Sequence, residues 1–237
     1  MLKLQQTVKK MEKILDTLSD CPLFSGISRA ELSGLVGCLG AKVMLHDRNS
    51  IVFDEGSEPK YVGILLSGSA QLIQEDYYGN RSLIGEVHSP DVFGEAFACA
   101  NVETLPLSVV ASEPSEVMLI ECSRILRTCS SACSYHHRLI YNLMQGLAEK
   151  TILLHRRCEI TSQRTTRDKL LSYLMLYAKD VRADSFDIPF DRQELADYIE
   201  VDRSGLSREI GRLCREGVIE CRRRHFRLLG SPEWERI

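Results

Sequence analysis

The stretch Arg192–Leu213 constrains this chain more than any other, because its pattern is typical of two short helices joined by a tight turn. Asp191 is a good N-cap and Glu194 follows three residues later, so together they can satisfy the free amides at a helix start. Asp202 offers a second N-cap, and its carboxylate also suits the positive end of a helix dipole. We therefore expect one helix to begin after Asp191 and another to begin near Arg203.

The second expected helix has an apolar face and a polar face. Leu206, Ile210 and Leu213 are spaced to pack on the first helix. The polar face carries donor side chains on the N-terminal half, the half that a helix-turn-helix presents to base edges, and Gly205 would let the backbone approach a groove. An ordinary helical hairpin with a solvated face would show the same local pattern. Base contacts are expected first from two arginines, most simply bidentate to guanine, and then from two serines: Arg203, Arg208, Ser204 and Ser207.

Positive charge is concentrated near the C-terminal end of the chain. The 237 residues have a net charge of −3, with the 44% hydrophobic and 27% charged composition of a soluble globular protein. Between residues 203 and 227, eight arginines stand against three acids. Such a basic end suits a site-specific DNA binder, since attraction to phosphate is confined to one face. Residues 217–230 look like the two strands and loop of a wing, and phosphate contacts are expected from Arg212, Arg222, Arg223 and Arg224.

Residues 41–122 have the texture of an antiparallel β domain. Six strand-length runs are separated by turn residues, among them Gly56, Gly68 and Gly79. Many short strands at regular spacing predict a barrel or double sheet that could enclose a small-molecule cavity. A helix capped by Ser28 is expected before the strands. An earlier helix over 3–18 has an apolar stripe made of Leu4, Val8, Met11, Leu15 and Leu18.

The best long helix in the sequence covers residues 134–161. Its apolar residues recur at steps of three and four, which suits pairing with a second copy of the chain, although part of the stripe could rest on the β domain. The fold class is therefore α+β, with an N-terminal domain over 1–133, the helix over 134–161 and a winged helix-turn-helix domain over 162–237. The seam of the long helix consists of Ile140, Leu143, Leu147, Thr151, Leu154 and Cys158.

The cysteines and the hydropathy pattern bear on the compartment. Nine cysteines without a C-x-x-C pair favour reduced thiols over a disulfide framework. The first twenty residues carry charges throughout and lack the apolar core of a signal peptide. No apolar run approaches the length of a membrane span. We expect a cytoplasmic protein with no membrane partner.

The order of β domain, FGEAF segment, long helix and terminal RQELADYIEVDRSGLSREIGRL resembles the CRP/FNR family of bacterial transcription regulators, from about Phe24 to Leu229. The resemblance implies a β-roll of the cupin-like, cyclic-nucleotide-binding type, a dimerisation helix and a winged helix-turn-helix. It also implies a homodimer on inverted-repeat double-stranded DNA, a small-molecule effector in the roll, and RNA polymerase as a further partner. FNR-type members have a glutamate where Ser204 stands, so their half-site preference does not transfer to this chain.

The resemblance also bears on the effector. Family members that bind cyclic AMP use the glutamate after the glycine for the ribose hydroxyl, which Gly94 and Glu95 match, and a downstream arginine for the cyclic phosphate. Here that arginine position falls on Leu105, followed by Pro106. Neither residue can pair with a phosphate, and an unpaired buried charge is expensive, so we expect no useful cyclic AMP binding. The implied effector pocket comprises Gly94, Glu95, Leu105, Pro106, Leu154 and His155.

Other cofactors find little support, and the effector stays unidentified. Only Cys21 and Cys38 occupy the N-terminal region where oxygen-sensing relatives hold an iron–sulfur cluster, which argues against a cluster. His155 could touch an effector or ligate haem, although a satisfied polar contact is the more ordinary use of a histidine at such a place. The sequence leaves four possibilities open for the effector: an uncharged or apolar molecule, haem, a redox signal through a thiol, or no ligand. Three soft ligands could share a face if 122–137 were one helix, whereas structural zinc normally takes four: Cys129, Cys133 and His136 or His137.

The sequence therefore predicts a DNA-binding transcription regulator rather than an enzyme. It contains no phosphate loop, no nucleophile–base constellation and no paired metal motif. A regulatory module of the cyclic-nucleotide-binding type, or a redox or haem sensor whose output is a protein interaction, would share the β domain. Such a module would not need the arginine-bearing second helix and the basic wing.

Overall fold

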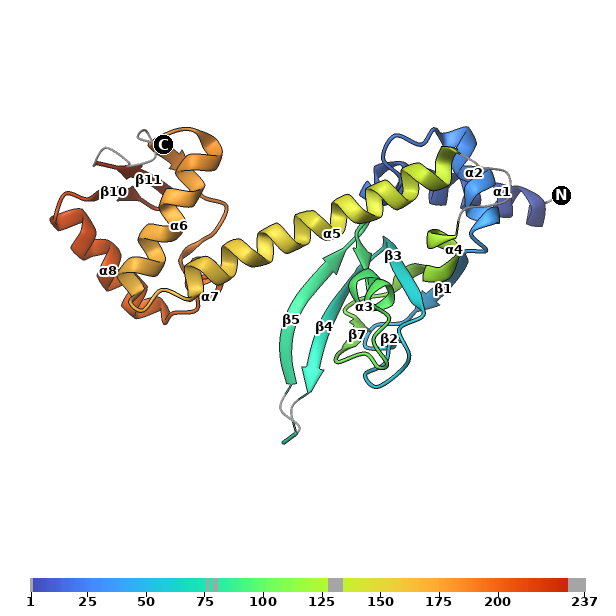
Figure 1. Ribbon diagram of the computed structural model, residues 1–237, viewed down its shortest axis with the longest axis horizontal. Helices are drawn as coiled ribbons and strands as arrows, with labels where there is room; N and C mark the ends of the chain where they lie inside the picture. The colour runs from blue at the N-terminus through green and yellow to red at the C-terminus, as the bar shows by residue number, and fades with distance from the viewer. Residues whose placement is uncertain (1, 76, 79–80, 128–133, 230–237) are drawn as a thin grey trace. The chain divides into compact units, whose positions relative to one another are not determined.

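The computed structural model describes residues 2–75, 77–78, 81–127 and 134–229 (Figure 1). The chain divides into two compact units, Met1–Glu149 and Lys150–Ile237. The boundary falls inside the long helix α5 (Ser134–Thr161), whose bounds are those expected from the sequence. The division into 1–133, 134–161 and 162–237 stays a prediction. Across the described ranges, no helix combines the length and apolarity needed to cross a lipid bilayer.

Two four-stranded antiparallel sheets form the body of the first unit. The chain passes from one sheet to the other through Gly68 alone, whose φ of +86° is a conformation that favours glycine. The predicted double sheet is thereby confirmed. One sheet has the order β1 (Lys42–His46), β8 (Ser115–Glu121), β3 (Tyr61–Ser67) and β6 (Val92–Phe93). The other has the order β2 (Ile51–Phe53), β7 (Ser108–Ala111), β4 (Ser69–Glu75) and β5 (Arg81–His88).

Strand β3 is buried on both faces, and its alternation divides the interior of the first unit into two cores. Ile64 and its neighbours at even positions face a core built with the helices, where Met118 of β8 joins them. Leu65 points into the space between the two sheets, together with Val117. The second of these cores is the interior of the roll, the place where a ligand cavity was expected.

Helices cover the sheet that contains β3. They are α1 (Leu2–Asp20), the short η1 (Pro22–Phe24), α2 (Arg29–Cys38) and the first turns of α5. The capping box of Ser28 and Glu31 at the start of α2 is present, as expected. The stripe predicted for α1 is corrected at Met11, which is 45% exposed because the buried face turns through Ile14, Leu15 and Leu18. The side chains of Leu4 and Val8, and the turn residue Gly79, lie outside the described part of the chain.

Three short elements were not anticipated from the sequence. The two-residue strand β6 pairs with β3, and helix α3 (Glu95–Ala100) follows it directly. After β8, helix α4 (Cys122–Leu126) ends well before α5 begins at Ser134. Residues 122–137 are therefore not one continuous helix.

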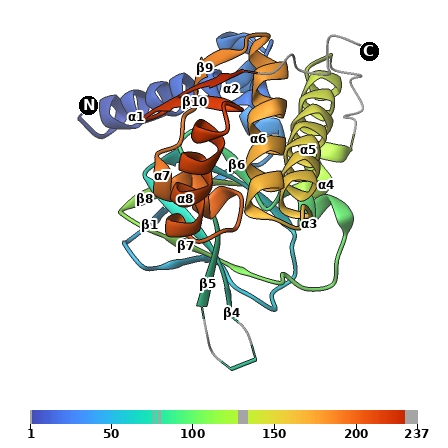
Figure 2. The same cartoon turned by 90° about the vertical axis from the view of Figure 1, so that its left-hand side faces the viewer.

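The second unit is a winged helix-turn-helix, as predicted. Its core is apolar and centres on Leu174, Leu206 and Phe226, and Ile160 near the end of α5 joins it. Figures 1 and 2 both show the small sheet at one edge of this unit, beside its helices. The sheet has the order β10 (Ile219–Arg222), β11 (His225–Leu228) and β9 (Ser185–Asp187), and the helices are α6 (Thr166–Val181), α7 (Arg192–Tyr198) and α8 (Arg203–Arg215).

Candidate nucleic-acid interface

Both helices of the motif begin at aspartate caps, as predicted. Asp191 Oδ1 accepts hydrogen bonds from the amides of Gln193 and Glu194, at 2.7 and 2.9 Å, and the Glu194 carboxylate accepts one from the Asp191 amide. Asp202 Oδ1 accepts from the Gly205 amide at 2.7 Å. Hydrogen bonds from the Ser204 hydroxyl and the Gly205 amide hold the pKa of Asp202 below its usual value. The caps therefore fix where α7 and α8 begin.

Gly205 has a local role in addition to the one expected. A Cβ atom at this position would collide with the carboxylate of Asp202. The missing side chain therefore makes room for the cap of α8. Whether it also allows a close approach to a DNA groove stays a prediction.

The turn between α7 and α8 contains an uncommon conformation. Glu200 has a φ of +55°, in the left-handed region that favours glycine. A non-glycine residue there is strained by roughly 1 kcal/mol. The Glu200 carbonyl accepts a hydrogen bond from Lys169 Nζ of α6 at 3.3 Å.

The recognition helix α8 buries one face and exposes the other. Leu206, Ile210 and Leu213 are buried in the core of the second unit, as predicted. On the outer face the N-terminal residues Arg203, Ser204, Ser207 and Arg208 are all exposed.

Local contacts distinguish these four exposed residues. The Ser204 hydroxyl is occupied by Asp202 Oδ1 at 2.6 Å, and Arg208 Nε donates to the Ser204 carbonyl at 3.4 Å. Within the described residues, Arg203 has no hydrogen-bond or ion-pair partner. Arg203 is therefore the side chain of this set that is best placed to bind an external acceptor.

An arginine on α6 braces the back of the recognition helix. Arg167 lies 3.4 Å from a Glu209 oxygen and 2.7 Å from a Glu216 oxygen. The hydrogen bond from Arg167 lowers the pKa of Glu216. Arg212, which was predicted to contact phosphate, also pairs with Glu216, at 3.1 Å. It would have to leave this pair, or share it, to reach DNA.

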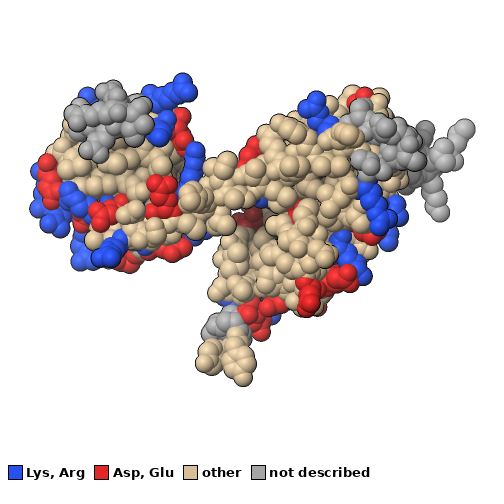
Figure 3. Space-filling view, viewed as in Figure 1, with Lys and Arg blue, Asp and Glu red and all other residues tan. Residues whose placement is uncertain are grey.

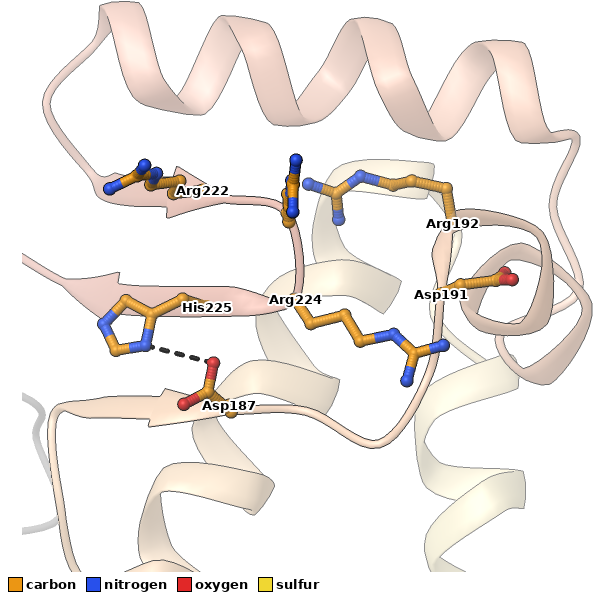
Figure 4. Close-up of a pocket in the computed structure, with 7 residues that line it drawn as sticks. Asp187, Asp191, Arg192, Arg222, Arg224 and His225 are labelled. Carbon is orange, nitrogen blue, oxygen red and sulfur yellow. Dashed lines mark hydrogen bonds and ion pairs between the residues drawn. The ribbon is translucent and has the colours of Figure 1, made fainter.

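The wing and the start of α7 enclose a cleft of about 730 Å³ (Figure 4). The predicted phosphate-binding residues Arg222, Arg223 and Arg224 line it, and Arg223 turns the hairpin with a φ of +58°. Two basic residues that the sequence reasoning missed also line it, Arg192 and His225. The position of Arg192, directly after the cap of α7, was the sequence feature that could have indicated its place at the cleft.

Internal contacts hold several side chains of this cleft. The Arg192 guanidinium lies 5.1 Å from the centre of the Phe226 ring. His225 Nδ1 is 3.3 Å from Asp187 Oδ1, and its other ring nitrogen is 3.0 Å from the Ser185 hydroxyl. Figure 3 shows Lys and Arg side chains gathered over α8, with acidic residues between them. The cleft and α8 together form a basic surface that suits a polyanion.

The segment that resembles a nucleotide site lies in the first unit. Gly94 has a φ of +76° and packs on the ring of Phe53, and Glu95 is only 5% exposed. Phe53 and Phe93 pack with ring centres 5.2 Å apart. Leu105 is buried and exchanges backbone hydrogen bonds with the 56–57 turn, whereas Pro106 is exposed. Leu105 is thus a buried apolar residue, and not a cation, at the position where an arginine would pair with a phosphate.

The remaining predicted pocket and seam residues lie on α5. Leu143 is buried in the core of the first unit and Leu147 packs against that core, so this part of the stripe rests on the roll. Ile140 is half-buried. Leu154 and His155 belong to the second unit, so the pocket that would join them to Glu95 stays a prediction. The rest of the stripe is exposed: Thr151, Leu154 and Cys158.

The cysteine and histidine groups considered as metal ligands are only partly described. Cys129 and Cys133 lie outside the described residues, His136 is buried and His137 is exposed. Within the ranges that the structure covers, no three His, Cys, Asp or Glu residues are arranged to hold a metal ion. Cys21 is buried and Cys38 is exposed.

Two family models and two relatives match this chain. The model of the cyclic nucleotide-binding domain matches residues 45–132, and that of the Crp-like helix-turn-helix domain matches residues 168–232. A probable transcriptional activator of Rhizobium leguminosarum bv. viciae is 26% identical over 192 residues, which cover 78% of this chain and 75% of the relative. The transcriptional activator protein FnrL of Cereibacter sphaeroides is 23% identical over 231 residues, 90% of this chain and 88% of the relative.

A solved structure shares the fold. The c-di-GMP responsive global regulator CLP of Xanthomonas campestris matches with a TM-score of 0.51 and 19% identity, over 84% of this chain and all of that one. The roll, the long helix and the terminal winged motif therefore occur together in a known regulator.

Proposed function

The chain belongs to the CRP/FNR family of transcription regulators, and we propose that it binds an inverted-repeat operator as a homodimer. It is a sequence-specific DNA-binding regulator of transcription. In the proposed complex, two copies of α8 related by a twofold axis enter successive major grooves, so the half-sites lie about one helical turn apart. A regulator of bacterial genes works in the cytoplasm, where we place this chain.

The observation that carries this proposal is the exposed, basic N-terminal half of α8, opposite the buried face made of Leu206, Ile210 and Leu213. We assign base contacts to Arg203 and Arg208, whose planar guanidinium groups match the two acceptors of guanine. Ser207 is a lesser candidate. Ser204 is the weakest, because its hydroxyl already donates to Asp202.

Phosphate contacts are assigned to the wing cleft. Arg222, Arg223 and Arg224 are exposed there, and Arg192 enters from the start of α7. These contacts would add salt-dependent affinity and little sequence information. Arg212 is a secondary candidate because Glu216 already neutralises it.

The dimer seam proposed for α5 is shifted by one residue row from the predicted stripe. Since Leu143 faces the core, the exposed apolar row at helical spacing is Tyr141, Met144, Ala148 and Ile152. Tyr141, Met144 and Ile152 are each more than half exposed. An apolar row of this kind on a long helix is stabilised by burial against its own copy.

Control by an effector in the roll is proposed from the buried Glu95, which follows the half-buried Gly94. With Leu105 buried at the position that would bind phosphate, an uncharged or apolar small molecule fits the interior better than a cyclic nucleotide. The effector would favour one arrangement of the DNA-binding units over another. RNA polymerase is the proposed partner at the promoter.

The direct test is selection of DNA duplexes from a randomised library by the full-length protein, followed by footprinting on the selected sequence. The proposal predicts an enriched inverted repeat, with two protected half-sites centred about 10 base pairs apart. Enrichment of a single unrepeated site, or of no sequence, would refute the dimeric operator.

A further inference from the structure

Arg157, in the last turns of α5, contacts the turn of the helix-turn-helix at two points. Its guanidinium carbon lies 5.8 Å from the centre of the Tyr198 ring, and Tyr198 is the last residue of α7. Its Nη2 atom lies 3.5 Å from Glu200 Oε1. All three residues belong to the second unit, so the end of α5 is a part of the DNA-binding unit.

Glu200 adopts a strained backbone conformation, so we ask what its side chain contributes in return. Its left-handed backbone favours glycine, which would adopt it without strain. The glutamate instead supplies a carboxylate to Arg157 of α5, while its carbonyl accepts a hydrogen bond from Lys169 of α6. The turn is therefore held from two different helices.

The Arg157 side chain is half-exposed, but one of its atoms is buried. Its Nε atom is buried and has no hydrogen-bond partner among the described residues. A guanidinium that forgoes a hydrogen bond there is compensated by the Tyr198 ring and by the Glu200 carboxylate. Both contacts direct the guanidinium toward the turn.

The neighbouring Arg156 provides a matched contrast. It forms an ion pair with Asp180 of α6 at 2.6 Å, and the side chains of this pair are 41% and 48% exposed. The Arg157 and Glu200 side chains are 43% and 59% exposed. The two pairs are similar in type and exposure, but only one of them reaches the turn.

We propose that Arg157 is a positioning residue for operator binding. Through Tyr198 and Glu200 it fixes the turn that sets α8 relative to α7, and Arg203 lies only three residues beyond Glu200. This inference rests on the proposed reading of DNA by α8. It makes the end of α5 the element through which a change in that helix reaches the base-contacting arginines.

The test compares operator affinity and unfolding temperature in full-length variants, with a duplex that the parent selects from a randomised library. Arg157→Ala should weaken binding about tenfold, because it removes both contacts. Glu200→Gln should weaken it about threefold, because it removes the charge but keeps the backbone conformation. Arg156→Ala is the control and should stay within about twofold of the parent.

Two further variants separate positioning from simple stability. Glu200→Gly should weaken binding although its unfolding temperature is equal to or above that of the parent, because glycine relieves the strained backbone. The double variant Arg157→Ala with Glu200→Gln should bind no more weakly than Arg157→Ala alone, since the lost contact is shared.

Two results would overturn the inference: parental affinity in Arg157→Ala, or an equal loss in Arg156→Ala and Arg157→Ala. Because the parent is titrated with the same duplex, failure of the proposed function is seen separately. Failure of the parent to select any duplex would overturn both proposals, whereas equal binding of a selected duplex by parent and variants would overturn this one alone.

Discussion

The two units keep their polar side chains in different places. The buried polar residues Glu95, Ser115 and His136 all lie in the first unit. In the second unit, within the described residues, every charged side chain is at least partly exposed around an apolar core. Exposed arginines can meet DNA without any prior ligand, whereas a group as buried as Glu95 can meet only a ligand that enters the interior. The residues proposed to bind DNA can therefore be recognised on the surface, whereas those proposed to bind an effector cannot.

The largest expected effect concerns the apolar core of the second unit. Leu206→Ala in α8 should lower the free energy of unfolding by about 2–5 kcal/mol, because it leaves a cavity at a fully buried position. Ser207→Ala, next to it on the exposed face, should change it by less than about 0.5 kcal/mol. Urea unfolding measures both. Equal effects at the two positions would break the contrast between core and surface.

The next effect concerns the exposed apolar row on α5. Met144→Glu should raise the dissociation constant of the dimer at least about tenfold, because the seam would bury an unpaired charge. Met11→Glu, also on a helix surface of this unit and 45% exposed, should leave the dimer intact. Analytical ultracentrifugation measures both constants. If the two variants behave alike, α5 does not supply the seam.

A smaller effect concerns the exposed cap residue Asp202 and its dependence on pH. The pKa of Asp202 is lowered in the folded state by the Ser204 hydroxyl and the Gly205 amide. A lowered pKa means that the cap stabilises the fold above the ordinary value, near pH 4, and that this contribution is lost as the pH falls through the folded-state pKa. Thermal unfolding should show the parent more stable than Asp202→Ala at pH 6, with a gap that narrows below about pH 4. A gap that is constant from pH 6 to 3 would contradict the assignment.

The smallest expected effect is none at all. Isothermal titration of the full-length protein with cyclic AMP should give no binding heat beyond that of the matched control 5′-AMP. The reason is that Leu105 stands where the family's phosphate-binding arginine would stand. It cannot neutralise a phosphate bound near the buried Glu95. Binding at about micromolar affinity or tighter would show that another residue supplies the cation.

Elements governed by local rules were predictable from the sequence. The caps at Asp191 and Asp202 and the bounds of α5 depend on neighbouring residues, so they were predicted correctly. Which side of an amphipathic helix is buried depends on partners that are distant in sequence. That is why Met11 is exposed, against expectation, and why the spacing alone left open whether Leu143 faces the β domain or a second copy of the chain. Strand β6 was missed because two residues carry no alternation, and only its pairing with β3 defines it.

The same distinction applies to the candidate site. Exposure of Arg203 and Arg208 followed from the buried Leu206 face, which helical spacing reveals. The roles inferred for Arg157 and Arg167 could not be predicted, because their partners lie about 40 residues away in sequence. What binds beside Glu95 is likewise set by side chains brought together only by the fold.

In the proposed complex, α8 reads bases while the wing holds phosphates. The measurement that tests it most directly is the affinity of the parent, Arg203→Ala and Arg223→Ala across a library that varies every operator position. Arg203→Ala should lose about 1–3 kcal/mol and its preference at one symmetric base pair, whereas Arg223→Ala should keep every preference and bind all sequences more weakly. An Arg203→Ala protein whose base preferences match those of the parent would contradict the account.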